Sequence, residues 1–377
     1  MSDRPLDIVV VGLSLSSSWG NGHATTFRGL IRGLDTLGHR VLFLERDVPW
    51  YARHRDLAMP DFCELAYYDS VDDLREGFAG HVSGADAVIV GSFVPEGVAI
   101  IDMIASLRPA CLCFYDIDTP VTLAKLAQRD EEYLAGRQIG LFDIYFSFTG
   151  GPVLQRLQDC HGARRAAALY CSVDASRYCP TGEPVRWDLG YLGTYSADRQ
   201  KTLEQFLIEP ARLLPQMHFV VAGPQYPPDV DWPANVERIE HLPPKDHPSF
   251  YSRQRFTLNV TRADMIAAGW SPSVRLFEAA ACGTPIISDF WEGLDTLLPE
   301  GEALLVARTT DDVVRLLTSM PEDRRKAMAT AARKRVLSSH TADMRAAQLI
   351  GHLRHVRDGG KTIKTEDHAY ADTHDAA

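Results

Sequence analysis

Residues 271–287 read SPSVRLFEAAACGTPII and carry the clearest signal for the fold. Ser271 is a good N-cap residue and Pro272 suits the first position of a helix, so the pattern predicts a helix that begins there. Gly283 follows the last apolar residue and is expected to close the helix. A short buried strand is predicted to begin at Pro285, so the stretch has the helix-to-strand order of an α/β domain.

Polar groups gather at the start of this predicted helix. The amide groups of Ser273 and Val274 would point out of the helix start, where an anionic phosphate is well accommodated. Arg275 and Glu278 lie one turn apart, so a cation and a carboxylate share one face. A diphosphate beside Arg275 and a sugar diol beside Glu278 would fit this face, which indicates a nucleotide-sugar site. The alternative is a surface Glu278 paired with Arg275.

Both halves of the chain alternate apolar strands with helical segments. The first half opens as strand, glycine loop, helix and strand within residues 7–44. A break rich in Pro and Gly lies between residues 178 and 187, and the second half then repeats the same architecture. The sequence therefore predicts two Rossmann-like, doubly wound domains at residues 1–180 and 181–340, a closing helix at 341–356, and a disordered tail at 357–377.

The composition is typical of a soluble globular protein. Of the 377 residues, 45% are hydrophobic and 24% are charged. The net charge of −11 argues against a nucleic-acid partner, which requires a basic face. No stretch approaches the ~20 apolar residues of a membrane span, and no signal-peptide pattern is visible. The seven cysteines form no C-x-x-C pair, so we expect reduced thiols in a cytoplasmic protein.

Several phrases together resemble a known family. Residues 277–285, FEAAACGTP, are similar to the E-A-x-A-x-G-x-P segment of group-1 glycosyltransferases with the GT-B fold. Further phrases resemble the bacterial CgeB-like branch: WGNGHATT at 19–26, ERDVPWY at 45–51, DIDTP at 116–120 and LNVTR at 258–262. The resemblance implies two Rossmann-like domains that face a central cleft, with the acceptor on the first and the nucleotide sugar mainly on the second.

The resemblance also implies roles, and the chain departs from it at one position. It implies that Glu278 holds the ribose of the nucleotide and that the transferred sugar keeps its anomeric configuration. Many relatives carry a second glutamate eight residues earlier, where this chain has Trp270. Trp270 is therefore a candidate for contact with the sugar or the acceptor.

The second half offers further candidates at the ends of its predicted strands. Gly193 and Thr194 form a glycine turn, and Arg199 and Lys201 behind them suit a diphosphate, or are solvated charges. Arg262 ends another strand, and ligands bind at the carboxyl ends of strands in such sheets. The resemblance adds His241 as a nucleobase contact. The expected donor-binding set is Gly193, Thr194, Arg199, Lys201, His241, Arg262, Ser273, Val274, Arg275 and Glu278.

The first half carries the candidate catalytic residues. Asn21 and Gly22 precede His23 in the loop after the first strand, where glycine lets the backbone approach a ligand closely. His23 is expected to act as a general base or to bond a sugar hydroxyl, and the alternative is a helix cap.

Asp116 and Asp118 form a D-x-D triplet, which binds metals in another glycosyltransferase fold. Its distance along the chain from the nucleotide signature favours a hydrogen-bond acceptor or general base instead. A helix cap formed by Asp118 is the third possibility.

The sequence thus predicts a glycosyltransferase of the hexosyltransferase type. It would move a sugar from a nucleoside-diphosphate sugar to an unidentified glycan, protein or small-molecule acceptor. We expect the donor to be UDP-linked. We expect no cofactor and no metal, because arginine and helix-dipole charge can neutralise the diphosphate. The alternatives are a nucleotide-sugar epimerase and a non-catalytic nucleotide-sugar-binding partner. Exposed aromatic residues such as Trp19 and Trp50 are candidates for stacking on a sugar.

Overall fold

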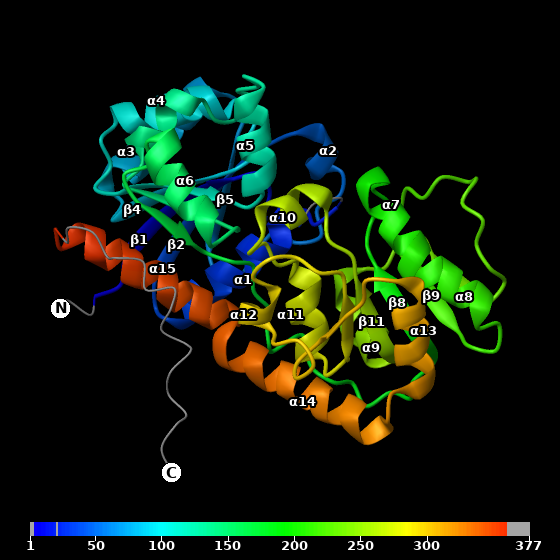
Figure 1. Cartoon of the computed structure of the whole chain (residues 1–377). Helices are drawn as coiled ribbons and strands as arrows, with labels where there is room; N and C mark the ends of the chain where they lie inside the picture. The colour runs from blue at the N-terminus through cyan, green and yellow to red at the C-terminus, as the bar shows by residue number, and fades with distance from the viewer. Residues whose placement is uncertain (1–3, 20–21, 360–377) are drawn as a thin grey trace, which may run out of the picture. The chain divides into compact units, whose positions relative to one another are not determined.

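The computed structural model describes residues 4–19 and 22–359, which divide into two compact units (Figure 1). Unit 1 holds the chain up to Tyr170 and the residues from Asp343 onward, and unit 2 runs from Cys171 to Ala342. The chain passes from unit 1 into unit 2 after Tyr170, before the predicted boundary at residue 180. The reason is that the amide of Val173 donates to the carbonyl of His340 at 3.1 Å, within unit 2. Asn21 and most of the predicted tail, residues 360–377, lie outside the described residues.

Unit 1 is built on a parallel sheet with the strand order β3-β2-β1-β4-β5-β6-β7. Its strands are β1 (Asp7–Gly12), β2 (Arg40–Arg46), β3 (Glu64–Tyr68), β4 (Ala87–Gly91), β5 (Leu112–Asp116), β6 (Ile144–Ser147) and β7 (Ala166–Ala168). Its helices are α1 (His23–Thr36), α2 (Pro49–Ala52), α3 (Val71–Gly84), α4 (Gly97–Ser106), α5 (Thr119–Ala127), α6 (Pro152–His161) and α15 (Ala342–Arg357).

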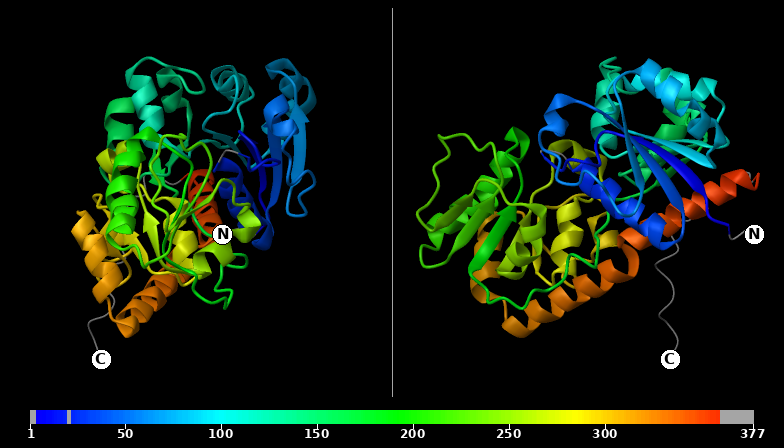
Figure 2. Two further views of the ribbon diagram at one scale, coloured as in Figure 1. Left: turned by 90° about the vertical axis from the view of Figure 1, so that its right-hand side faces the viewer. Right: turned by 180° about the vertical axis from the view of Figure 1, so that it is seen from behind.

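The central strand β1 pairs with β2 on one side and with β4 on the other (Figure 2). Its sequence DIVVVG is apolar and almost wholly buried, as a parallel strand covered on both faces requires. The winding of the chain reverses between β1 and β4, so the carboxyl ends of these strands mark the switch point where open α/β sheets bind ligands.

The predicted closing helix is α15, and from Asp343 onward it belongs to unit 1. The side chain of Gln348 donates to the carbonyl of Ala168 at the end of β7, with a distance of 3.0 Å. The rings of Phe146 and His352 lie 5.6 Å apart. The edge strand β3 is absent from the sequence prediction, because it is only partly buried and lacks the apolar run of the central strands.

Unit 2 repeats the arrangement with the strand order β10-β9-β8-β11-β12-β13. Its strands are β8 (Trp187–Leu192), β9 (Phe219–Ala222), β10 (Val236–Ile239), β11 (Gln254–Asn259), β12 (Ile286–Ser288) and β13 (Leu305–Val306). Its helices are α7 (Ala197–Leu203), α8 (Glu209–Leu213), α9 (His247–Ser252), α10 (Ala263–Ala268), α11 (Val274–Ala281), α12 (Leu294–Leu297), α13 (Thr310–Ser319) and α14 (Glu322–Ser339). The switch point of this sheet lies between β8 and β11.

Helix α11 lies within residues 271–287, but it begins at Val274 and not at Pro272. Ser273 is the N-cap with extended backbone angles (φ −83°, ψ 149°), and its hydroxyl donates to Oδ1 of Asn259 at 2.8 Å. The predicted end is confirmed, because Gly283 takes a left-handed conformation (φ 72°) directly after the C-cap.

The two Rossmann-like units confirm the predicted GT-B fold class. The cysteines are free, as expected for reduced thiols. Within the described ranges, we find no helix long and apolar enough to cross a membrane.

Candidate functional site

Arg275 links the two strands at the switch point of unit 2. Its Nε donates to the carbonyl of Leu192, the last residue of β8, at 2.6 Å, and Nη1 donates to Oδ1 of Asn259, the last residue of β11, at 2.8 Å. The guanidinium lies 4.9 Å from the ring centre of Tyr191. The alternative, a surface Glu278 paired with Arg275, is therefore wrong, because Arg275 bonds to the strand ends and Glu278 is buried.

Two further arginines lie near Arg275 in unit 2. The charges of Arg275 and Arg262 both lower the pKa of Arg199, after burial, which is the largest cause. Nε of Arg199 is buried without a hydrogen-bond partner among the described residues, whereas its Nη2 donates to the carbonyl of Thr194 at 2.6 Å. Arg199 is therefore repelled by two other guanidinium groups and keeps an unsatisfied buried donor, an arrangement that could accommodate an anion. We call Arg199, Arg262 and Arg275 the arginine cluster.

The glycine turn after β8 is packed tightly beside this cluster. The amide of Gly193 donates to the carbonyl of Ala222 at 2.9 Å, and the hydroxyl of Tyr226 donates to the carbonyl of Gly193 at 3.1 Å. Gly223 has a φ of 141°, and a side chain there would overlap the carbonyl of Gly193. The turn is thus held in place, and Thr194 is exposed at its tip.

Glu278, one turn after Arg275 on α11, is buried. Its Oε2 accepts a hydrogen bond from the hydroxyl of Tyr251 at 3.0 Å, and Nδ1 of His247 lies 3.9 Å away. Burial and the charge of Glu278 raise the pKa values of Tyr178 and Tyr251 far above the ordinary value, so both phenols stay protonated and can donate. The side chain of Tyr178 also hydrogen-bonds to the carboxylate of Glu278.

Trp270 occupies a strained position before α11. It has a positive φ of 40°, its amide donates to the carbonyl of Glu292 at 2.6 Å, and its ring lies against Gly293. The ring thus packs within unit 2, and Trp270 supplies no carboxylate there. Lys201 and His241 are both exposed, Lys201 on α7 and His241 after the edge strand β10.

In unit 1, His23 and Asp118 meet at the carboxyl edge of the sheet. His23 is the first residue of α1, only 6% exposed, and its Nε2 lies 3.2 Å from Oδ2 of Asp118. Because a carboxylate only accepts, Nε2 is the donor in this contact, and in the neutral imidazole Nδ1 is then the acceptor. Nδ1 is buried without a partner among the described residues. The ring of Phe93, in the loop after β4, contacts the ring of His23 edge-on at 5.5 Å.

Asp116 lies deeper, inside unit 1. It accepts hydrogen bonds from Tyr145 at 2.5 Å and from Thr122 at 2.7 Å, and its Oδ1 also accepts from the amide of Asp118 at 3.3 Å. Burial raises its pKa to about 6. Asp116 is fully buried and holds the amide of Asp118, and its predicted catalytic role stays a prediction. Asp118 is the N-cap residue of α5, as the helix-cap alternative expects, although its side chain makes no capping hydrogen bond.

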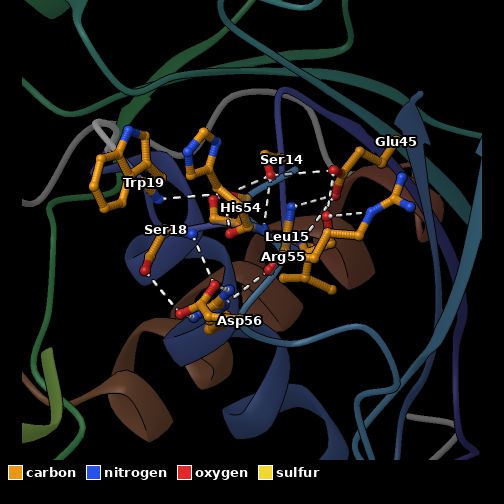
Figure 3. Close-up of polar contacts among 11 residues, drawn as sticks. Ser14, Leu15, Ser18, Trp19, Glu45, His54, Arg55 and Asp56 are labelled. Atoms are coloured by element: carbon orange, nitrogen blue, oxygen red, sulfur yellow. Dashed lines mark hydrogen bonds and ion pairs between the residues drawn. The ribbon is translucent and has the colours of Figure 1, made fainter. Parts of the chain in front are cut away.

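The loop after β1 is held by two carboxylates, shown in Figure 3. Glu45, at the end of β2, accepts from the amides of Leu15 at 2.7 Å and Ser16 at 2.9 Å. Asp56 accepts from the amide of Ser18 at 3.0 Å and is paired with Arg28 at 2.7 Å. These contacts fix the backbone that leads to His23. Gly22 is the N-cap of α1 with a negative φ of −82°, so its freedom to adopt a positive φ is not used.

Several residues of these sites escaped the sequence analysis. Asn259 was noted only within a family phrase, yet it orients both Arg275 and Ser273. Tyr251 and His247 come from α9, a separate helix, so no local spacing relates them to Glu278. Within the described ranges, no three His, Cys, Asp or Glu side chains gather as a metal site would require.

Residues 199–351 match the glycosyl transferase-like family, which covers the arginine cluster, α11 and Glu278. A search of curated proteins finds no match.

Solved structures match almost the whole chain at low sequence identity. Sucrose-phosphate synthase from Thermosynechococcus elongatus has a TM-score of 0.69 at 13% identity, over 94% of this chain and 100% of that one. HepE from Anabaena, solved with UDP and glucose, has a TM-score of 0.68 at 13% identity, over 93% and 99% of the two chains. An alpha-glucosyltransferase solved with UDP-glucose and DNA has a TM-score of 0.68 at 12% identity, over 93% of this chain and 100% of that one. At such identities the similarity establishes the GT-B fold.

Proposed function

We propose that the protein is a group-1 glycosyltransferase that moves a sugar from a nucleoside-diphosphate sugar to an acceptor bound by unit 1. The observation that carries the proposal is the arginine cluster at the switch point of unit 2, with its unsatisfied buried donor on Arg199. An anion that bridges these side chains would relieve their repulsion and satisfy this donor. A diphosphate that becomes a leaving group is such an anion, and its charge grows as the bond to the sugar breaks.

The nucleoside would extend from the diphosphate toward Glu278. The carboxylate of Glu278 would accept from a ribose hydroxyl, while the hydroxyls of Tyr251 and Tyr178 hold it in place. We propose that the donor nucleotide is UDP, in line with the UDP-bound proteins of the same fold. The arginines would neutralise the diphosphate, so we propose that the reaction needs no metal.

His23 is proposed to contact the reacting hydroxyl of the acceptor. Its Nδ1 has an acceptor lone pair and no partner, and a buried unsatisfied group of this kind costs about 1–3 kcal/mol. A hydroxyl that donates to Nδ1 would remove this cost. Asp118 holds the opposite nitrogen and would stabilise the imidazolium if the ring takes a proton.

The stereochemical course distinguishes two roles for His23. The resemblance implies retention, and we keep it as the proposal to be tested. The alternative is inversion, in which Nδ1 of His23 takes the acceptor proton during a single displacement at the anomeric carbon. Proton NMR of the first sugar released from the donor in water decides between them, provided that it is read before mutarotation.

The proposal is tested by release of nucleoside diphosphate from UDP-, GDP-, dTDP- and ADP-linked sugars, with His23→Ala as the comparison. We expect release with one donor, and a large loss in the variant. The expected CgeB-like branch and cytoplasmic location are part of the same proposal. Binding without release would support a non-catalytic partner, which Trp270 in place of a glutamate keeps open. Conversion of the donor to its epimer without release would support the epimerase alternative.

A further inference from the structure

We propose that Trp19, His54 and Trp50 form an aromatic platform that binds a pyranose ring, so that the acceptor is a carbohydrate. The acceptor role rests on the proposed function above, whereas the sugar-binding role does not. The rings of Trp19 and His54 are stacked, with centroids 4.7 Å apart and planes 14° from parallel (Figure 3). The ring of Trp50 lies 5.3 Å from that of His54 at 48°.

The platform exposes apolar ring surface to water. Trp19 is 41% exposed and Trp50 is 58% exposed, although both are large aromatic residues that usually bury most of their surface. One face of a pyranose ring carries mainly C–H groups, which pack against such rings, while its hydroxyls point outward to polar neighbours. A ligand of this kind removes the exposed ring surface from water.

The platform is held rigidly, which an accidental surface cluster would not require. Nδ1 of His54 donates to the carbonyl of Trp50 at 2.8 Å, and the hydroxyl of Ser17 donates to the carbonyl of His54 at 2.8 Å. The amide of Trp19 donates to the same hydroxyl of Ser17 at 3.3 Å. Glu45 and Asp56 anchor the adjoining backbone, as described above. A preformed surface of this kind reduces the entropy lost on binding.

The charges beside the platform favour a neutral hydroxylated ligand over a nucleic acid. Arg28 pairs with Asp56 at 2.7 Å and Arg55 pairs with Asp47 at 2.8 Å, so these cations are already neutralised. Asp47 and Asp56 remain partly exposed and can accept hydrogen bonds from sugar hydroxyls. Aromatic rings also stack on nucleobases, but binding of nucleic acid draws on unpaired basic groups.

The position of the platform relates it to the reaction. Trp19 belongs to the loop after β1 that ends at His23, and Trp50 and His54 follow β2. All three therefore lie at the carboxyl edge of the unit 1 sheet, next to the switch point between β1 and β4. A sugar bound here would lie at the same sheet edge as Nδ1 of His23.

The test is binding of maltotriose, cellotriose and N-acetylated chitotriose to the full chain, measured by saturation-transfer NMR and tryptophan fluorescence. We expect at least one to bind, with affinity lowered at least about tenfold in Trp50→Ala and within about threefold of wild type in Trp50→Tyr. Phe290→Ala, which removes another half-exposed ring in unit 2, is the matched control and should bind as wild type.

Three outcomes would overturn the platform: no binding of any trisaccharide, equal binding by Trp50→Ala, or tighter binding of a thymidine hexanucleotide that Trp50→Ala weakens. UDP binding is measured on the same samples to keep the two proposals apart. UDP binding without trisaccharide binding would contradict the proposed sugar-binding platform but not the proposed glycosyltransferase function. Trisaccharide binding without binding of any nucleoside diphosphate would end the transferase and leave a sugar site.

Discussion

Nε2 of His23 lies 3.2 Å from Oδ2 of Asp118, and this contact joins the start of α1 to the loop after β5 across the switch point of unit 1. Neither residue is near the other in the sequence. The pair orients the imidazole and leaves Nδ1 as the atom that can meet a ligand.

Removal of this imidazole should therefore affect turnover and not donor binding. We expect His23→Ala to lower the rate of nucleoside diphosphate release by about 10²–10⁴. Asp118→Asn should lower it less, because an amide oxygen can still accept from Nε2. UDP affinity, measured by calorimetry, should stay unchanged in both. Asp130→Asn, which removes an exposed carboxylate paired with Lys125, is the control. Wild-type rates in His23→Ala would contradict the role of the pair.

Asp116 should make the stability of unit 1 depend on pH. Its folded pKa of about 6 lies above the ordinary 3.8, so the folded state keeps a proton that the unfolded state has lost. The free energy of unfolding should therefore fall as pH rises from about 4 to about 6, by up to about 3 kcal/mol, and then level off. Asp116→Asn cannot titrate and should lack this component. Urea unfolding of both proteins at pH 4.5 and pH 7 measures this component. If the two proteins differ in the free energy of unfolding by the same amount at both pH values, the assignment to Asp116 is contradicted.

Glu278 should recognise the ribose. We expect Glu278→Gln to weaken UDP binding about tenfold or more, since a hydrogen bond to a charged group contributes about 1.5–3 kcal/mol. The loss of affinity caused by Glu278→Gln should be smaller with 2′-deoxy-UDP, which lacks one of the hydroxyls that could donate a hydrogen bond to the Glu278 carboxylate. Calorimetry on the four combinations gives the coupling energy directly. Additive losses would mean that the carboxylate contacts another part of the ligand.

The turn at Gly293 should be sensitive to a side chain. Its φ is 89°, and an added Cβ would lie 2.5 Å from the ring of Trp270. Gly301 has a similar φ of 77° but open space around it, so it serves as the matched control. We expect Gly301→Ala to lower the free energy of unfolding by about 1–2 kcal/mol, and Gly293→Ala to lower it further because the indole must move. Equal losses in urea unfolding would show that the ring yields freely.

The fold could be predicted from the sequence because each central strand is an apolar run and each turn carries glycine or proline. The exceptions have local causes. Strand β3 is half exposed at an edge, and α11 begins late because the hydroxyl of Ser273 donates to Asn259. The domain boundary came too late because the segment after Cys171 is irregular but bonds within unit 2.

The site was predicted in part. Arg275, Glu278, His23 and Asp118 were chosen as candidates from their motifs and from strand ends. The partners of these residues could not be predicted, because Tyr251, Asn259 and Glu45 are brought to them only by the tertiary fold. Burial also separates Asp116 from Asp118, although the D-x-D spacing treats them alike. The platform contact of Trp19 with His54 crosses two loops and left no signal beyond the aromatic residues themselves.

The most direct test of the central claim is a calorimetric titration of UDP into the wild type, Arg262→Ala and Lys201→Ala. Arg262 and Lys201 are both exposed cations of unit 2, but only Arg262 belongs to the arginine cluster. We predict that Arg262→Ala weakens binding about tenfold or more, whereas Lys201→Ala stays close to wild type. Equal affinities in all three proteins, or no UDP binding by a wild type that also fails to bind GDP, dTDP and ADP, would contradict a nucleotide-sugar site at this cluster.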